Sequence, residues 1–330
     1  MSSFQSFWVE KNAEGVKHSI IQRDLEDLPA GEVLIEVHYS SLNYKDALSA
    51  NGSPGVTKSY PHAPGIDAAG VVVESSVSEF SVADKVIVIG FDLGMNTSGG
   101  FGQYIRVPAA WITPLPEGLS LRQSMVIGTA GLTASLCVEK LLQQGASPEQ
   151  GPVLVSGATG GVGSVAVSLL SKLGFPVLAS TGKPDKVKYL ESLGAQSVLP
   201  RSELEEANKR PMAAPIYANA IDTVGGEILT NIIKSLDYQG SVAICGLVAS
   251  PVFSTTVLPF ILRGVNVLGI DSVELPVLDK TRNWNRLAAE WSLPNLEEMA
   301  IDINLAGLSA AIADILAAKV AGRVVVDLRS

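Results

Sequence analysis

The residues of this chain best suited to bind a charged ligand are four closely spaced glycines: Gly157, Gly160, Gly161 and Gly163. An apolar run precedes them and apolar side chains spaced three and four residues apart follow them, which predicts a strand, a tight turn and a helix. Glycine permits positive φ and close backbone approach. The helix N-terminus then offers free N–H groups and the positive end of its dipole to an anion. The pattern predicts a site for the pyrophosphate of a dinucleotide.

The alternative is an ordinary tight turn between strand and helix, because the spacing G-x-x-G-G-x-G departs from the strict G-x-G-x-x-G pattern. The next segment favours the dinucleotide site. The helix is expected to end near Gly174, and residues 175–180 read as a second strand, which completes a βαβ unit. The backbone N–H groups expected to hold the pyrophosphate belong to Thr159, Gly160, Gly161 and Val162.

Length and composition describe a large globular protein. The 330 residues exceed the size that one core usually fills, so two domains are expected. A hydrophobic content of 47% against 17% charged residues excludes a disordered chain. The net charge of −9 and the lack of any basic cluster argue against a nucleic-acid partner.

The remaining composition signals concern the compartment. The N-terminal residues lack the basic and apolar regions of a secretory signal, and we find no run of 18 apolar residues, so no membrane span is expected. Cys137 and Cys245 lie in apolar segments and are expected to be small core residues in a reducing compartment. These features predict a cytoplasmic enzyme.

The elements that must position the glycine turn belong to two parts of the chain with different sequence patterns. Strands interrupted by many Gly and Pro residues predict a compact, barrel-like β domain over residues 1–125, with strands at 32–39, 70–74 and 84–89. From about residue 124, helices alternate with strands, which predicts a doubly wound parallel sheet and an α/β fold. The last 60 residues carry helices near 279–291 and 307–318 and a strand at 323–328.

Eight motifs run in order along nearly the whole chain. They are SSLNYKDAL at 40–48, PGIDAAG at 64–70, GTAGLTA at 128–134, GATGGVG at 157–163, YLESLGA at 189–195, AIDTVG at 220–225, CGL at 245–247 and TVLPFILR at 256–263. In these motifs the chain resembles the medium-chain dehydrogenase/reductase superfamily. Within it, the chain is similar to the zinc-free quinone oxidoreductase-like branch and its YhdH/YhfP group, which includes NADPH-dependent acryloyl-CoA reductases.

The resemblance implies three segments. Residues 1–125 would form a GroES-like β-barrel catalytic domain, and residues 126–270 an NADPH-binding Rossmann domain. Residues 271–330 would return to the catalytic domain. The resemblance also implies an active site in the cleft between the domains.

Metal ligands are scarce in this chain. A structural zinc site needs four closely spaced thiolates, whereas the sequence has two cysteines and three histidines. Asp67 stands where zinc-bearing relatives have a glutamate, but its neighbour is Ile66 in place of histidine. His62 lies in a proline-rich loop and is expected at the surface. Metal catalysis is therefore not expected.

The end of the second Rossmann strand bears on the cofactor. NAD enzymes place a carboxylate there, whereas this chain has none before Asp185. Hydroxyl groups and cations suit a 2′-phosphate, so these residues and the family pattern together predict NADPH. The residues expected near the 2′-phosphate are Ser180, Thr181, Gly182, Lys183 and Arg201. The alternative for the two cations is a pair of solvated surface charges. Leu247 and Ile270 are expected to line the nicotinamide side.

Hydride transfer without a metal needs an electron-poor acceptor, such as a C=C bond conjugated to a carbonyl group. The product then needs a proton, and its oxygen needs hydrogen-bond donors. The candidate catalytic residues are Tyr44, Asn43 and Asp46. Tyr44 is expected to touch the nicotinamide, and either donates the proton or only packs there. Asn43 and Asp46 are expected to orient the loop.

Two further cations near these residues have open roles. Lys45 contacts a substrate phosphate or is solvated. Arg323 reaches the active site or forms a structural ion pair.

The favoured activity is NADPH-dependent reduction of small α,β-unsaturated carbonyl compounds, with acryloyl-CoA as the first substrate candidate. A quinone reductase on the same scaffold is the nearest alternative. A non-catalytic NADPH-binding protein is the alternative from another class. An NAD-linked alcohol dehydrogenase is disfavoured, because zinc ligands and a Ser-Tyr-Lys triad are missing. The apolar strand at 265–270 is expected to pair with its copy in a homodimer.

Overall fold

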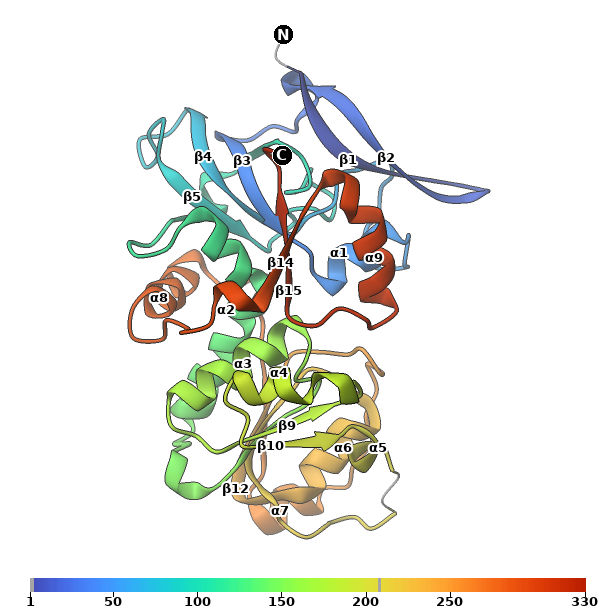
Figure 1. Cartoon of the computed structure of the whole chain (residues 1–330), viewed down its shortest axis with the longest axis vertical. Helices are drawn as coiled ribbons and strands as arrows, with labels where there is room; N and C mark the ends of the chain where they lie inside the picture. Colours follow the sequence, from blue (N-terminus) through green and yellow to red (C-terminus); the bar gives the residue numbers. More distant parts are fainter. Residues whose placement is uncertain (1–2, 207–208) are drawn as a thin grey trace. The chain divides into compact units, whose positions relative to one another are not determined.

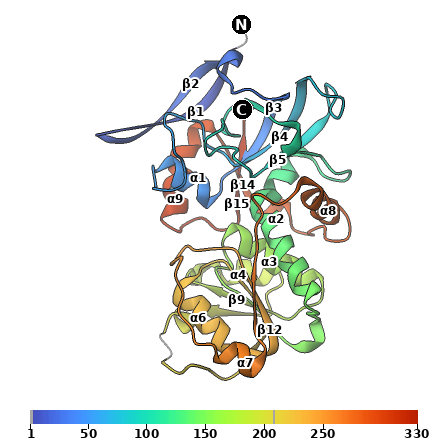
Figure 2. The same ribbon diagram turned by 180° about the vertical axis from the view of Figure 1, so that it is seen from behind.

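The computed structural model describes residues 3–206 and 209–330. The chain divides into two compact units, one formed by residues 1–129 and 272–330 and the other by residues 130–271. Each unit has a sheet and a set of helices of its own, seen from the front (Figure 1) and from behind (Figure 2).

The first unit is built on a seven-stranded sheet. Its strands are β3 (Val33–Ser41), β4 (Asp67–Ser75), β5 (Lys85–Ile89), β6 (Tyr104–Val107), β7 (Ile112–Pro114), β14 (Ala300–Asn304) and β15 (Arg323–Asp327). They lie in the order β14-β15-β3-β4-β5-β7, and β6 also pairs with β3. Only the pair β14–β15 is parallel among the described strands of this sheet. A separate hairpin joins β1 (Ser3–Asn12) to β2 (Gly15–Asp24).

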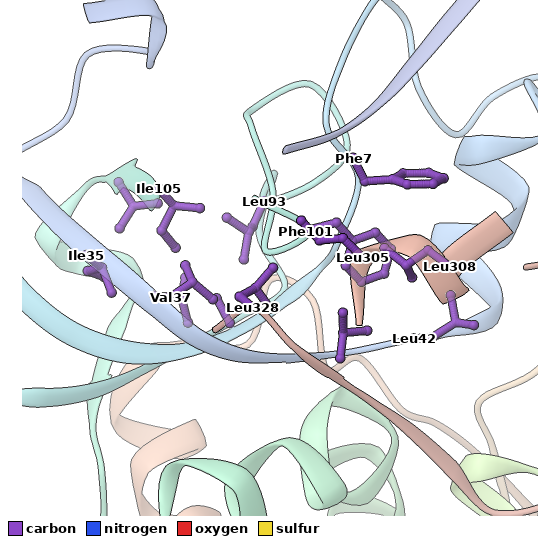
Figure 3. Packing of buried hydrophobic residues seen from close by; sticks show 14 of the residues in the cluster. Phe7, Ile35, Val37, Leu42, Leu93, Phe101, Ile105, Leu305, Leu308 and Leu328 are labelled. Atoms are coloured by element: carbon purple, nitrogen blue, oxygen red, sulfur yellow. The ribbon is translucent and has the colours of Figure 1, made fainter. Parts of the chain in front are cut away.

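The predicted strands at 32–39, 70–74 and 84–89 are confirmed as β3, β4 and β5. In β3 the alternate residues Val33, Ile35 and Val37 are buried, as expected of a strand with one face in a core. This core also receives Phe7 and Phe101 (Figure 3). The pairing of β15 with β3 places Val325 opposite Ser41, so the end of the chain lies beside the residues that lead into position 43.

The described residues of the first unit also form helices α1 (Tyr44–Ala50), α8 (Val277–Ala288) and α9 (Leu308–Leu316). The predicted helices near 279–291 and 307–318 are confirmed as α8 and α9. The sequence reading missed α1, which has only seven residues and carries the polar residues singled out above. In the structure α1 packs against α9.

Helix α2 (Leu121–Gln143) contains the point where the chain passes from the first unit to the second. Its backbone is non-helical at Gly128, where φ is 52°. By length and composition α2 could cross a membrane, but 78% of its most apolar stretch is buried within the protein. A helix buried in a protein core can be as long and as apolar as a membrane span, so length and composition alone do not identify α2 as one.

The second unit contains a parallel sheet of six strands. They are β8 (Val153–Val155), β9 (Val177–Thr181), β10 (Ser197–Pro200), β11 (Tyr217–Asp222), β12 (Leu236–Ile244) and β13 (Asn266–Gly269). The order β10-β9-β8-β11-β12-β13 reverses direction at β8, because the chain first builds outward to β10 and then returns to β11. The predicted doubly wound parallel sheet is therefore confirmed.

The helices of this unit are α3 (Gly161–Lys172), α4 (Val187–Ser192), α5 (Ser202–Glu205), α6 (Gly226–Ser235) and α7 (Leu258–Arg263). Helices α3 and α4 lie in front of the sheet in Figure 1, whereas α6 lies in front of it in Figure 2. The core on the α6 side includes Leu154, Ala220, Ile232 and Val242. The helix that the sequence predicts after the glycine turn, ending near Gly174, is confirmed as α3.

Candidate active site

Helix α1 begins at a buried carboxyl group. Asn43 precedes the helix with an extended backbone, and its N–H donates to Oδ2 of Asp46 at 2.8 Å. The other oxygen of Asp46 accepts from the N–H of Ile66 at 2.8 Å. Burial, aided by the nearby charge of Asp67, raises the pKa of Asp46 to about 7. Asp46 therefore ties the start of α1 to the chain just before β4.

A second buried carboxylate, Asp67, lies at the first position of β4 and is 0% exposed. Its Oδ2 accepts from Nδ2 of Asn43 at 2.8 Å and from the N–H of Thr129 at 3.0 Å. The hydroxyl groups of Ser41 and Thr129 also donate to it. A Cβ at Gly128 would lie 2.6 Å from Asp67 Oδ2, so this close approach of the backbone requires glycine.

Arg323, at the first position of β15, completes this group of residues. Its Nη2 lies 3.7 Å from Asp67 Oδ2 and donates to Ser41 Oγ at 2.9 Å. Its Nη1 donates to Asn43 Oδ1 at 3.2 Å. The structure thus shows the ion pair that was one of the two roles considered for Arg323. We call Ser41, Asn43, Asp46, Asp67 and Arg323 the buried carboxylate cluster.

Tyr44 and Lys45 form the first turn of α1, directly beside the cluster in sequence, and both are half-buried. The cluster fixes the backbone on which Tyr44 stands, because Asn43 on one side and Asp46 on the other are both hydrogen-bonded. A tyrosine on a rigid support can place its hydroxyl group reproducibly. The sequence reading named Asn43, Tyr44 and Asp46 as candidates, but did not connect them to Ser41, Asp67 or Thr129.

The expectation that His62 lies at the surface is wrong. The His62 backbone pairs with Val9 in β1, and its Nε2 lies 2.9 Å from Ser49 Oγ. Burial lowers the pKa of His62 to about 4. The proline-rich loop folds back onto the hairpin, a long-range contact that a local sequence pattern does not reveal.

In the second unit, the six parallel strands end at one edge of the sheet. The carboxyl ends of β8, β9, β10, β11, β12 and β13 and the segments that follow them therefore share this edge. The residues predicted to bind the cofactor in this unit lie at these strand ends or just after them. The switch point of the sheet lies between β8 and β11. Open α/β sheets bind their ligands at such a point.

The predicted glycine turn lies at this switch point, between β8 and α3. A positive φ of 58° at Gly157 allows the turn. A Cβ at Gly163 would lie 2.4 Å from the Gly157 carbonyl oxygen, so only glycine lets α3 start this close to the turn. Gly161 and Val162 are the first residues of α3, where N–H groups lack intrahelical partners. Thr159 is buried, and its hydroxyl lies 3.1 Å from that of Thr181 at the end of β9.

Asp222 and Thr223 brace this turn, and the sequence reading did not assign them. Ser156 Oγ donates to Asp222 Oδ1 at 2.6 Å, and the Gly225 N–H donates to Oδ2 at 2.8 Å. Thr223 Oγ1 donates to the Ser156 carbonyl at 2.9 Å. Burial raises the pKa of Asp222. The motif AIDTVG was the available signal, because these polar residues end an otherwise apolar strand.

The residues predicted near a 2′-phosphate lie at the ends of β9 and β10. Ser180 and Thr181 are buried, and the hydroxyl of Ser180 has no hydrogen-bond partner among the described residues. Arg201 donates its N–H to the Thr181 carbonyl at 2.8 Å, and its guanidinium lies against the exposed Gly182. The same guanidinium pairs with Glu205, Nε to Oε1, at 2.8 Å. Partial burial lowers the pKa of Lys183.

Leu247 and Ile270 follow β12 and β13. Leu247 is 56% exposed, which leaves its apolar side chain accessible to a ligand. Ile270 extends the sheet by donating its N–H to the Ile244 carbonyl at 3.1 Å. Across residues 3–206 and 209–330, we find no group of three or more His, Cys, Asp or Glu side chains arranged to hold a metal ion.

Two family models match separate parts of the chain. Residues 29–117 match the family described as alcohol dehydrogenase GroES-like domain, and residues 161–290 match the family described as zinc-binding dehydrogenase. Acrylyl-CoA reductase AcuI of Ruegeria pomeroyi is 45% identical over 99% of this chain and 100% of its own length. The crystal structure of Salmonella enterica YhdH in complex with NADP is 41% identical, with a TM-score of 0.95 over 98% of this chain and 99% of that one.

A third relative carries a different name and ligand. YhfP of Bacillus subtilis, named a putative quinone oxidoreductase, is 42% identical over 98% of this chain and 99% of its own length. Its crystal structure has NAD bound and superposes with a TM-score of 0.96 over 99% of this chain and 100% of that one. The chain therefore belongs to the medium-chain dehydrogenase/reductase superfamily, in the quinone oxidoreductase-like group that contains YhdH, YhfP and AcuI.

Proposed function

We propose that this protein is an NADPH-dependent reductase of α,β-unsaturated carbonyl compounds that converts acrylyl-CoA to propionyl-CoA without a metal. The observation that carries the proposal is the strand-end edge of the second unit. It combines a glycine turn at a helix N-terminus with hydroxyl groups and Lys183 at the end of β9, where no carboxylate precedes Asp185. The name of the AcuI relative supports the substrate.

The residues present fit NADPH. The close approach at Gly163 leaves the first turn of α3 open to a pyrophosphate, which Thr159, Gly160, Gly161 and Val162 would hold. The residues that would bind the 2′-phosphate are Ser180, Thr181, Gly182, Lys183 and Arg201. The Ser180 hydroxyl, which has no hydrogen-bond partner among the residues that the structure describes, would be one of the donors. Leu247 and Ile270 would line the nicotinamide. When bound, NADPH supplies the hydride.

The first unit would supply the other groups. Tyr44 would contact the nicotinamide and would deliver a proton to the carbon next to the carbonyl group, while Asn43 and Asp46 hold its backbone in place. Tyr44→Phe tests this role. If Tyr44 is the proton donor, kcat falls while the Kd for NADPH stays close to that of the wild type. If Tyr44 only packs, phenylalanine preserves both quantities.

Quinone reduction is the second candidate, favoured by the name of the YhfP relative. The deciding experiment compares kcat/KM for NADPH oxidation with acrylyl-CoA and with a simple quinone. A higher value for acrylyl-CoA supports the proposal, and a higher value for the quinone supports the alternative. The lack of a steady rate with any enone or quinone would indicate a non-catalytic NADPH-binding protein.

The choice of NADPH over NADH is tested at Lys183, because the YhfP structure contains NAD. Lys183→Ala removes one cation from the end of β9, so we expect the KM for NADPH to rise about tenfold, which corresponds to about 1.4 kcal/mol. The KM for NADH serves as the internal control and is expected to stay unchanged. An unchanged NADPH/NADH preference would contradict the assignment.

We also propose that the enzyme is a cytoplasmic homodimer, joined through the edge strand β13. An unpaired strand edge invites pairing with another chain. Exposed apolar side chains precede this strand, namely Val252, Val257, Ile261 and Leu262, at 59–70% exposure. A second copy would cover them. A monomeric mass by light scattering, or a dimer that Ile261→Asp leaves intact, would contradict this interface.

A further inference from the structure

Arg201 is held against the end of β9 by both its backbone and its side chain. Strand β10 lies beside β9 with Pro200 opposite Thr181, and Arg201 is the next residue. The N–H of Arg201 donates to the Thr181 carbonyl at 2.8 Å. Its guanidinium reaches over the turn after β9, where a Cβ on Gly182 would lie 3.0 Å from Cζ. The cation therefore lies beside the segment proposed to bind the 2′-phosphate.

The carboxylate partner of Arg201 stands on a fixed backbone. Glu205 is the last residue of α5, and its Oε1 lies 2.8 Å from Nε of Arg201. The preceding residue, Leu204, is buried in the core that includes α6. In α6, Nδ2 of Asn231 donates to the carbonyls of Leu204 and Glu206 at 2.9 Å each. The helix that carries Glu205 is thus anchored to the core, while the ion pair itself faces solvent.

This ion pair bears on the binding of an anion at the same place. A guanidinium binds a phosphate as it binds a carboxylate, through charge-assisted hydrogen bonds. A phosphate monoester carries about 1.5 to 2 negative charges near pH 7. A 2′-phosphate that approaches Arg201 must therefore displace the Glu205 carboxylate or lie beside it, and either outcome costs free energy. NADH has a hydroxyl group at this position, adds no charge and avoids this cost.

We propose that Glu205 is a specificity-determining residue that competes with the 2′-phosphate for Arg201 and so lowers the preference for NADPH over NADH. The inference rests on the proposed function, because it takes the end of β9 as the 2′-phosphate site. Strand β9 and the turn after it bring no carboxylate before Asp185, so α5 supplies one from outside the strand. The ratio of the two affinities then depends on the two cations, Lys183 and Arg201, and on the opposing charge of Glu205.

The experiment measures the Kd values of NADPH and NADH for the full-length protein by titration of the nicotinamide fluorescence. Glu205→Gln keeps the size of the side chain and removes its charge. We expect the Kd for NADPH to fall about fivefold, the upper end of what an exposed ion pair contributes, and the Kd for NADH to stay unchanged.

Glu203→Gln is the matched control, because it removes the same charge from the same helix. Among the described residues, Arg201 is paired with Glu205 and not with Glu203. The control should therefore leave the Kd for NADPH close to that of the wild type. In an Arg201→Ala background, Glu205→Gln is expected to have no more effect than Glu203→Gln has.

Three results would overturn the inference. They are an unchanged or higher Kd for NADPH in Glu205→Gln, an equal fall in Glu203→Gln, and a fall that persists without Arg201. A wild-type protein that does not bind NADPH would overturn the proposed cofactor together with this inference. NADPH binding that does not respond to Glu205→Gln would overturn this inference alone.

Discussion

The two candidate regions of this protein are built in opposite ways. The buried carboxylate cluster of the first unit consists of side chains that satisfy one another, with Asp67 and Arg323 at 0% and 3% exposure. The strand-end edge of the second unit consists of backbone N–H groups, glycines and partly exposed charges. Within the described part of the chain, the Ser180 hydroxyl there has no hydrogen-bond partner. The cluster is complete without a ligand, whereas the edge has unused donors. We infer that the first region positions side chains, whereas the second region binds a ligand.

The largest effect is expected where charge is buried. Asp67→Asn leaves the Arg323 guanidinium without its carboxylate, and breaking a buried pair in this way costs about 3–5 kcal/mol. The measurement is the free energy of unfolding of the first unit in urea. A loss below about 1 kcal/mol, the range of exposed pairs, would show that the cluster is not the rigid support described here.

The edge of the second unit is tested at Gly163. Gly163→Ala places a Cβ 2.4 Å from the Gly157 carbonyl oxygen, so α3 must move away from the turn. We expect the Kd for NADPH to rise about 100-fold, equivalent to about 2.7 kcal/mol. Gly269→Ala is the matched control, because a Cβ there meets nothing within 4 Å. Equal Kd values for the two variants would refute the predicted pyrophosphate site.

The pH dependence of the unfolding free energy should also distinguish the two regions, because Asp46 of the first unit has a raised pKa. Its pKa is about 7 in the folded protein against an ordinary value of 3.8, so the folded state binds the proton more tightly. Stability therefore falls as pH rises between about pH 4 and pH 7, by at most about 1.4 kcal/mol per pH unit. Asp46→Asn should remove this slope from the urea unfolding energy of the first unit.

His62 provides a control of opposite sign for that experiment. Its pKa is about 4 in the folded protein and 6.5 ordinarily, so the unfolded state binds the proton more tightly. Stability is lost as pH falls through this window, and His62→Gln should reduce that loss. Two variants that changed the pH profile in the same direction would contradict both assignments.

The smallest effect is expected at the exposed ion pair of the second unit. Glu205→Gln breaks the contact with Arg201, in which both side chains are 48% exposed. Exposed pairs contribute about 0–1 kcal/mol, so the urea midpoint should hardly move. Together with Asp67→Asn, this variant measures how strongly burial separates two arginine–carboxylate pairs of the same chain. If the two variants lost the same amount of unfolding free energy, the contrast between the two regions would be removed.

How well each region could be predicted follows from where its partners lie in the sequence. The glycine turn is contiguous, so residues 157–163 and the flanking apolar spacing predicted the βαβ unit. The partners of Asp67 are dispersed over Ser41, Asn43, Thr129 and Arg323, and no local pattern pairs them. The same reason explains the error at His62, whose neighbours come from β1 and α1. Asp222 was within reach of the sequence, because a carboxylate at the end of a buried strand needs a partner.

The position of Arg323 on β15 has a consequence for the order in which the molecule can be made. A ribosome completes Ser41, Asn43, Asp46, Asp67 and Thr129, and then the whole second unit, before it reaches Arg323 and the strand that pairs with β3. Until then the carboxyl groups of Asp46 and Asp67 lack the guanidinium of Arg323, which pairs with Asp67 in the folded protein. The second unit can form its whole sheet during synthesis. The first unit can balance the charge of its buried carboxylate only after Arg323 on β15 has been synthesised.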